Sequence, residues 1–155
     1  MKNYLCLLII LFGYATSYSN NRYENILPEI ECDFPIYQGG PVEQDNLYFI
    51  HKVPDLIPES IEVADGIFWG GNFESLKALL DRQEINENEI RFFLGYSGWG
   101  KHQLEDEIEL ESWFISENNL KNILEENENF WKEEILQKGG SYRLWANAPS
   151  NISLN

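Results

Sequence analysis

The sequence has few of the residues that build metal centres and disulfide frameworks. It contains two cysteines, Cys6 and Cys32, and two histidines among 155 residues. Two cysteines cannot make a disulfide framework, and this pair lacks the clustered spacing of a zinc site. Two histidines without an H-E-x-x-H motif or a repeated carboxylate motif also predict no metal site. We therefore expect no metal and no other cofactor.

Positive charge is also scarce. The chain has 11 Lys and Arg against 26 Asp and Glu, which gives a formal net charge of −15. Proteins bind nucleic acid and anionic lipid surfaces by neutralising negative charge with clusters of Lys and Arg. Direct binding of nucleic acid is therefore not expected. Hydrophobic residues make up 43% of the chain, which is enough for one domain of this length to build a buried core.

No apolar run is long enough to span a bilayer comfortably. The longest, residues 4–12, follows Lys2 and precedes several small residues, whereas a spanning helix needs about 20 apolar residues. This order is typical of an export signal, so the protein is exported if residues 1–17 are such a signal. A buried element, or a start site that does not represent the natural N-terminus, is the alternative. We divide the chain into an apolar head over residues 1–20 and one domain over residues 21–155.

Short strands and helices alternate in that domain. β-branched and aromatic residues bounded by turn residues predict strands over residues 35–38, 47–51, 61–63, 67–69 and 90–94. Helical spacing predicts a helix after the N-cap Asn72, a short helix within residues 103–111, and one or two helices between Ser116 and the terminator Gly139. Strands and helices without a regular βαβ repeat indicate the α+β class with a mixed sheet.

The glycine-rich segment Gly95–His102 follows the strand predicted over residues 90–94. It matches the phosphate-loop spacing G-x-x-x-x-G-K, but His102 stands where a hydroxyl group must bind Mg²⁺. The acidic residues that follow also oppose an anion at the start of a helix. A nucleophile elbow at Ser97 would need glycine where Trp99 stands. The segment therefore predicts neither nucleotide hydrolysis nor serine hydrolase chemistry.

Several side chains near this segment are open to a catalytic or a structural interpretation. His51, Glu105 and Glu107 would supply acid–base groups to a hydrolase-type enzyme if they converged on one cleft over residues 95–107. Residues of this kind are more often surface or structural residues. Trp99, flanked by glycines, is expected in a turn, where a partly exposed ring lines a pocket or an interface or only closes the turn against the core.

Four stretches, in chain order, resemble the YqgE/AlgH family of bacterial proteins. They are GGPV at residues 39–42, LGYSGWG followed by QLE and a tryptophan over residues 94–113, the segment over residues 131–140, and the tail over residues 140–149. The second resembles the family signature LGY-x-GW-x-x-GQLE-x-E. The resemblance covers residues 25–155.

The chain departs from the family pattern in two places. The family has glycine where His102 stands, and often proline where Lys101 stands. Its opening segment is not recognisable before Asn25, which leaves open whether the first strands of the domain are missing. Because the resemblance implies an intracellular protein, we expect a cytoplasmic location and keep export as the alternative.

The resemblance implies a single α+β domain whose mixed sheet curls into a pseudo-barrel with flanking helices. It implies less about activity, because members are commonly uncharacterised and some are labelled transcriptional regulators. We expect a non-enzymatic regulatory or binding protein that acts through a small ligand or a protein partner. Any effect on transcription would then be indirect. The hydrolase-type enzyme is the alternative.

The candidate ligand-binding residues lie in the GGPV turn and in the glycine-rich segment. Glycines let backbone amides approach a ligand closely, while aromatic and amide side chains supply stacking and hydrogen bonds. The candidates are Gly39, Gly40, Pro41, Gly95, Tyr96, Gly98, Trp99, Gln103 and Glu105. We assign no catalytic residue.

Overall fold

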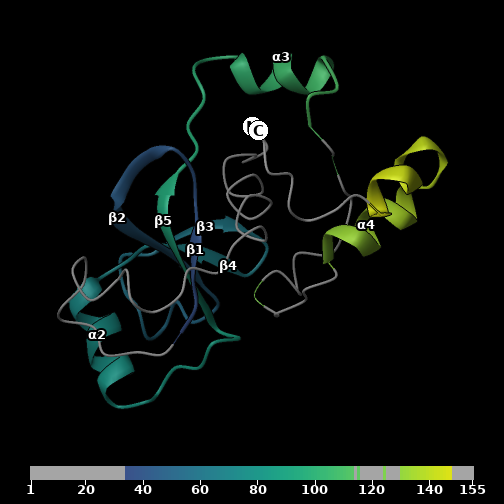
Figure 1. Cartoon of the computed structure of the whole chain (residues 1–155). Helices are drawn as coiled ribbons and strands as arrows, with labels where there is room; N and C mark the ends of the chain where they lie inside the picture. Colours follow the sequence, from purple (N-terminus) through teal and green to yellow (C-terminus); the bar gives the residue numbers. More distant parts are fainter. Residues whose placement is uncertain (1–33, 114, 116–123, 125–129, 148–155) are drawn as a thin grey trace.

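The computed structural model describes residues 34–113, 115, 124 and 130–147 (Figure 1). The apolar head over residues 1–20 lies outside the described residues, and so does the first part, residues 116–123 and 125–129, of the region predicted to form one or two helices. Both therefore stay predictions.

A five-stranded mixed sheet forms the centre of the domain (Figure 1). Its strands, in the order β1-β5-β2-β4-β3, are β1 (Ile36–Gln38), β5 (Ile90–Tyr96), β2 (Val42–His51), β4 (Ile67–Trp69) and β3 (Ile61–Ala64). β1 runs parallel to β5, and the other pairs are antiparallel. The predicted α+β class with a mixed sheet is confirmed. β1 and β3 are the outer strands of this sheet, so the described strands form an open sheet and not a closed barrel.

Helices lie around this sheet. They are α2 (Phe73–Asp81), α3 (Gln103–Glu109), α4 (Phe130–Lys138) and the 3-10 helix η3 (Gly140–Asn147). Asn72 caps α2 as predicted, because its side-chain oxygen accepts a hydrogen bond of 2.9 Å from the Ser75 N–H. Gly139 follows α4 with a φ of 71°, as expected for a glycine that ends a helix. Within the described ranges, no helix is long and apolar enough to cross a membrane.

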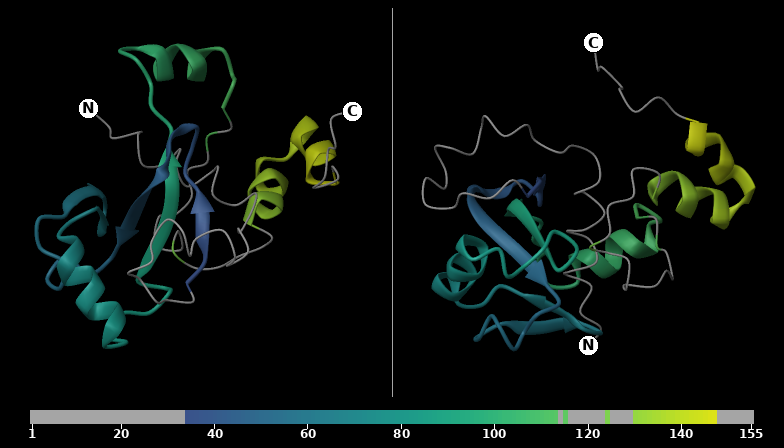
Figure 2. Two further views of the ribbon diagram at one scale, coloured as in Figure 1. Left: turned by 60° about the vertical axis from the view of Figure 1, so that its left-hand side comes forward. Right: turned by 90° about the horizontal axis from the view of Figure 1, so that it is seen from below.

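Each face of the sheet carries buried hydrophobic side chains. Phe92 lies in a cluster with Leu76 and Leu80 of α2, so α2 covers this face. Phe93, the next residue of β5, lies on the other face in a cluster with Ile50. Alternate residues of β5 thus enter two different cores, which is why nearly the whole strand is apolar. In Figures 1 and 2, α2 and α4 lie on opposite sides of the sheet.

The connection between β1 and β2 crosses over β5. The two strands are consecutive in the chain, yet they flank β5 and do not pair with each other. The crossing segment, residues 39–41, is held by a 2.8 Å hydrogen bond from the Gly39 N–H to the Leu94 carbonyl oxygen. A Cβ atom at Gly39 would lie 2.1 Å from the Gly95 carbonyl oxygen, and one at Gly40 would lie 2.3 Å from that of Tyr96. Only glycine lets the two backbones approach this closely.

Residues 43–46 lie in the segment left between the strands predicted over residues 35–38 and 47–51, and in the structure they belong to the start of β2. The register of β2 on β5 shifts between Val42 and Leu47, so the four residues make an irregular, exposed stretch of the strand. The Glu43 carboxylate accepts hydrogen bonds from the Tyr48 hydroxyl and the Asn46 amide. These bonds lower the pKa of Glu43, and the bond to Glu43 raises the pKa of Tyr48.

We predict that Gly95→Ala destabilises the protein far more than Gly66→Ala. Both glycines have left-handed backbones, with φ of 68° and 73°. A Cβ at Gly95 would also lie 2.6 Å from the Val42 carbonyl oxygen, whereas nothing lies within 4 Å of one at Gly66. The expected loss of unfolding free energy in urea is about 2–5 kcal/mol at Gly95 and about 1–2 kcal/mol at Gly66. Equal losses of unfolding free energy in the two variants would contradict the prediction that the close backbone contact at the crossing requires glycine at Gly95.

Candidate functional site

The glycine-rich segment leaves the end of β5 directly beside the crossing segment. Val42 pairs with Tyr96 on one side of this point. Ser97 is buried, and its hydroxyl donates a hydrogen bond of 3.4 Å to the Gly39 carbonyl oxygen. Ser97 therefore joins the segment to the crossing and is not exposed as a nucleophile would need to be.

A single carboxylate holds the rest of this loop together. Glu107 Oε2 accepts hydrogen bonds from the indole Nε1–H of Trp99 at 3.0 Å and of Trp113 at 2.8 Å. Its Oε1 accepts a bond of 2.9 Å from Gln103 Nε2, and Gln103 Oε1 in turn accepts one of 3.0 Å from the Gly100 N–H. The two indole rings contact each other edge to face, with centroids 5.8 Å apart. We call Trp99, Gln103, Glu107 and Trp113 the Glu107 clamp.

The clamp keeps Glu107 ionised. Hydrogen bonds from Trp113, Gln103 and Trp99 hold the pKa of its carboxyl group below the usual value, because all three donors favour the charged form. Both carboxylate oxygens already accept hydrogen bonds within the chain. A carboxylate in this state is a weak base. Glu107 instead joins the residues on either side of α3, because Trp99 precedes this helix and Trp113 follows it.

His51 is a buried, neutral side chain. Its Nε2–H donates to the Gly70 carbonyl oxygen at 3.0 Å, and its Nδ1 accepts from the Val53 N–H at 3.2 Å, which fixes the tautomer. Burial lowers the pKa of His51, and the bond to Gly70 offsets this only in part. Both ring nitrogens have partners, as expected for a structural histidine.

The three candidate acid–base residues do not meet in one cleft. His51 pairs with Ile90 at the first residue of β5, whereas the loop carrying Glu105 and Glu107 begins after Tyr96, its last residue. Six steps along a strand separate these points by about 20 Å. His51 therefore cannot exchange a proton with either glutamate through a shared substrate.

The nine candidate ligand-binding residues fall into two groups. Gly39, Gly40 and Gly95 fill the crossing itself, where backbone atoms already occupy the space beside each Cα. The others surround it: Pro41, Gly98, Gln103 and Glu105 are exposed, and Tyr96 and Trp99 are half-buried.

Gly98 and Gly100, on either side of Trp99, are different from the glycines of the crossing. Neither has a positive φ. A Cβ at Gly100 would have its nearest neighbour, Gln103 Oε1, at 3.6 Å, and one at Gly98 would lie 3.3 Å from the edge of the Tyr96 ring. Backbone conformation and packing thus do not require glycine at Gly100, and at Gly98 they require at most a small movement of one ring.

The sequence interpretation missed the role of Glu107 in the clamp. The available signal was the spacing of Gln103 and Glu107, four residues apart on one helix face. The two indole donors lie outside α3, so helical spacing alone could not pair them with Glu107.

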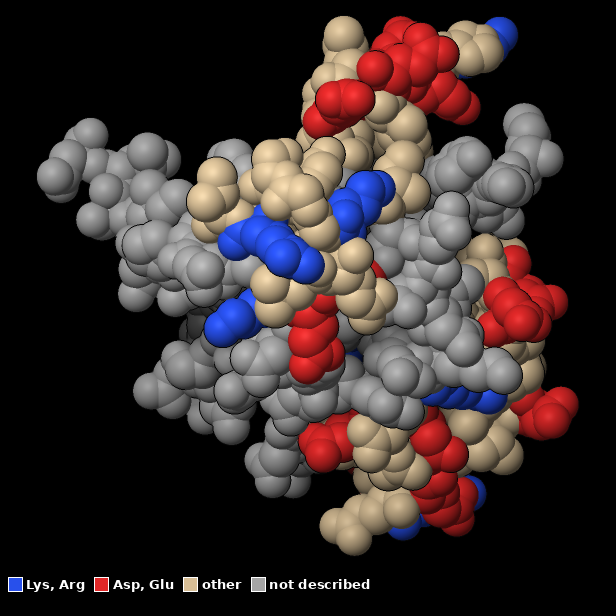
Figure 3. Space-filling model, turned by 90° about the vertical axis from the view of Figure 1, so that its right-hand side faces the viewer, with Lys and Arg blue, Asp and Glu red and all other residues tan. Residues whose placement is uncertain are grey.

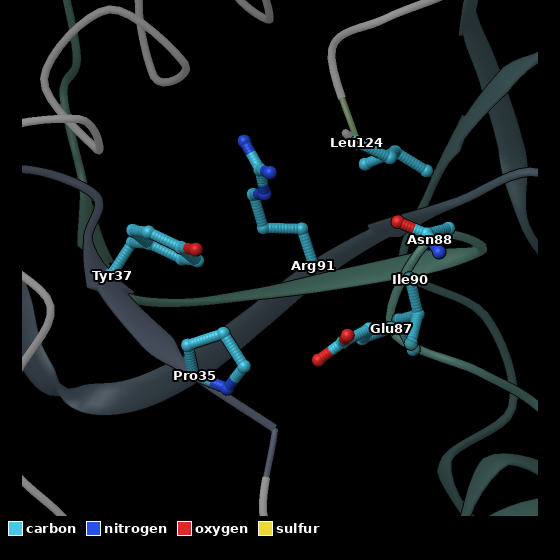
Figure 4. A pocket seen from close by; sticks show the side chains of 7 residues that line it. All are labelled: Pro35, Tyr37, Glu87, Asn88, Ile90, Arg91 and Leu124. Atoms are coloured by element: carbon cyan, nitrogen blue, oxygen red, sulfur yellow. The ribbon is translucent and has the colours of Figure 1, made fainter. Parts of the chain in front are cut away.

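A small cavity lies near the other end of β5. It is lined by Pro35, Tyr37, Glu87, Asn88, Ile90, Arg91 and Leu124 (Figure 4). Arg91 is only 5% exposed, and its guanidinium carbon lies 4.8 Å from the centroid of the Tyr37 ring, a cation–π contact. The available signal for this site was one arginine within the otherwise apolar strand 90–94. In the part of the chain that the structure describes, no group of three His, Cys, Asp or Glu residues could hold a metal ion.

The fold and the clamp define a single α+β domain built around a tryptophan-bearing glycine loop. The AlgH-like family model matches residues 16–143, so the chain belongs to the AlgH-like family. It is 46% identical over 126 residues to a UPF0301 protein of Chlorobium limicola, a match that covers 81% of this chain and 67% of that protein. It is 36% identical over 148 residues to a UPF0301 protein of Cytophaga hutchinsonii, covering 93% and 81%. The predicted family is confirmed.

Two solved structures share the fold. The AlgH protein from Pseudomonas aeruginosa has a TM-score of 0.61 at 19% identity, covering 87% of this chain and 75% of that one. A protein from Corynebacterium diphtheriae has a TM-score of 0.56 at 20% identity, covering 86% and 73%. At these identities the likeness concerns the fold alone.

We predict that acid releases the clamp. As pH falls through the pKa of Glu107, which lies below the ordinary glutamate value, the carboxylate loses charge and the hydrogen bonds from the two indoles weaken. The indole N–H resonances of Trp99 and Trp113 should shift together in an NMR titration below about pH 4.5. Glu107→Gln should abolish this shift, and Glu105→Gln, on the exposed side of α3, should leave it unchanged. A shift that persists in Glu107→Gln would contradict the clamp.

We predict that His102→Gly stabilises the protein. His102 has a φ of 65° and makes no side-chain hydrogen bond as the N-cap of α3. The left-handed conformation costs a non-glycine residue about 1–2 kcal/mol, and the extra chain entropy of glycine offsets part of the gain. Urea unfolding should show a gain of about 1 kcal/mol. Lys101→Gly, at a residue without a positive φ, should give no gain, and equal effects of the two changes would contradict the prediction.

Proposed function

We propose that this protein is a non-enzymatic binding protein, and that the exposed part of the glycine-rich loop takes a small ligand or a protein partner. The observation that carries this proposal is the pair Gly98 and Gly100. Their φ values are not left-handed, and space is open or nearly open beside them. A residue without a side chain here leaves the backbone beside Trp99 accessible to another molecule.

The clamp supports this proposal, because it orients Trp99 before anything binds. The indole N–H is fixed on Glu107 at 3.0 Å, and the ring lies against Trp113. A side chain that is already ordered loses little conformational entropy on binding, so more of the contact energy remains as affinity. Rigid aromatic side chains with half-exposed rings are common anchors of interfaces.

The negative net charge of the chain limits which partners it can bind directly. With a net charge of −15, direct contact with a phosphate backbone is opposed. If the protein regulates transcription, as the label of some family members suggests, we propose that it does so indirectly, in the cytoplasm, through a ligand or a protein. The hydrolase-type alternative is less well supported, because His51 lies about 20 Å along β5 from the loop.

A side chain added at Gly100 should block binding without unfolding the protein. We would purify wild type, Gly100→Leu and the matched control Asp81→Leu, at an exposed position of α2, under native conditions. Native mass spectrometry of each would report co-purified small molecules and proteins. We expect the associated mass to be lost from Gly100→Leu alone, with circular dichroism and urea unfolding unchanged. Retention of the same associated mass by Gly100→Leu would contradict the proposal.

A further inference from the structure

One face of the molecule carries patches of opposite charge. Figure 3 shows Asp and Glu side chains at the end where α3 lies and at several other places on this face, whereas Lys and Arg side chains gather near its centre, where α4 and η3 lie, beside a few acidic side chains. The basic side chains gather there although the whole chain has more than twice as many acidic as basic residues.

The acidic patch lies on α3 and the turn after it. Its exposed carboxylates belong to Glu105, Asp106, Glu109 and Glu111. Leu110, between the last two, is 76% exposed. In Figure 1 and in the left view of Figure 2, α3 stands beyond one end of the sheet, so this patch lies at that end of the molecule.

The basic patch lies on the helical hairpin formed by α4 and η3. Its exposed cationic side chains belong to Lys132, Lys138 and Arg143. Of the two carboxylates in this hairpin, Glu134 is buried and Glu133 is exposed.

The basic patch also carries exposed apolar side chains. Leu136 is 43% exposed and Leu144 is 80% exposed. A single exposed aliphatic side chain is unremarkable, but Leu136 and Leu144 lie among cationic residues and Leu110 lies among carboxylates. The two patches therefore differ in charge and both carry exposed apolar side chains, so their chemistry is complementary.

We propose that this face is an interface between two copies of the chain, in which α3 of each copy docks on the α4–η3 hairpin of the other. A two-fold interface uses the same surface on both subunits, so that surface must complement itself after rotation. A face with an acidic end and a basic centre meets this requirement, because a half-turn places each acidic patch on the partner's basic patch. The contact between an acidic and a basic patch then forms twice, so both patches of each copy are occupied and a third copy cannot add.

The chemistry of the two patches sets the strength of this dimer. Its charged groups are exposed, so salt screens their attraction. The overall charge of −15 repels two copies at longer range. The dimer is therefore expected to be weak and to form only as the protein concentration rises.

Charge reversal on each side of the contact tests the proposal. Sedimentation velocity over a range of protein concentrations would compare wild type with Glu109→Lys, Arg143→Glu and the double variant. We expect each single change to raise the dissociation constant about tenfold, and the double variant to recover most of the loss. The two single changes alter the net charge in opposite directions, so a general charge effect cannot explain a loss in both.

Two further variants act as control and as complement. Glu74→Lys changes the net charge by the same amount as Glu109→Lys, on the exposed surface of α2, and should not weaken the dimer. Leu144→Ser should weaken it without altering urea unfolding, because the side chain is 80% exposed. A wild-type chain that stays monomeric at every concentration, or a double variant that fails to recover, would overturn the proposal. Recovery in the double variant with no effect of Glu74→Lys would support it.

Discussion

The close contact between the crossing segment and the end of β5 is the constraint on which the rest of the structure depends. β1 and β2 can flank β5 only because Gly39 and Gly40 have no Cβ: one at Gly39 would lie 2.1 Å from the Gly95 carbonyl oxygen, and one at Gly40 would lie 2.3 Å from that of Tyr96. The crossing places β5 between two strands and directs the chain after Tyr96 out of the sheet. The glycine-rich loop begins at that point.

The Glu107 clamp then gives this loop one conformation. The hydrogen bonds among two indoles, one amide and one carboxylate hold the loop in place through side chains of the chain itself. This separates two roles that glycines play within a few residues of each other. Gly95 serves the backbone crossing, whereas Gly98 and Gly100 leave the surface beside Trp99 open, as the proposed binding function requires.

Local features of this fold are predictable from the sequence, and long-range ones are not. The cap at Asn72 and the terminator at Gly139 depend on neighbouring residues, so their types alone identify them. Runs of β-branched and aromatic residues located the strands, except for the first residues of β2, but could not show that β1 and β2 flank β5, because pairing partners lie far apart in the chain. Residues 43–46 have the composition of a turn, yet pairing with β5 keeps them within β2. The sequence alone could not test a catalytic role for His51, because only the fold shows that the length of β5 separates this residue from the glycine-rich loop.

The position of β5 between β1 and β2 has a consequence for the order in which the chain assembles. Ile36 pairs with Phe92 and Phe49 with the same residue from the other side, so both pairings wait for the last strand of the sheet to be synthesised. Until then, β1 and β2 each leave unpaired backbone groups and apolar side chains exposed to other chains. A newly made chain is thus most prone to aggregate in the interval before residues 90–96 leave the ribosome. The two carboxylates and two amides of residues 43–46 make the start of β2 polar. These polar side chains oppose the pairing of β2 with a neighbouring chain during that interval.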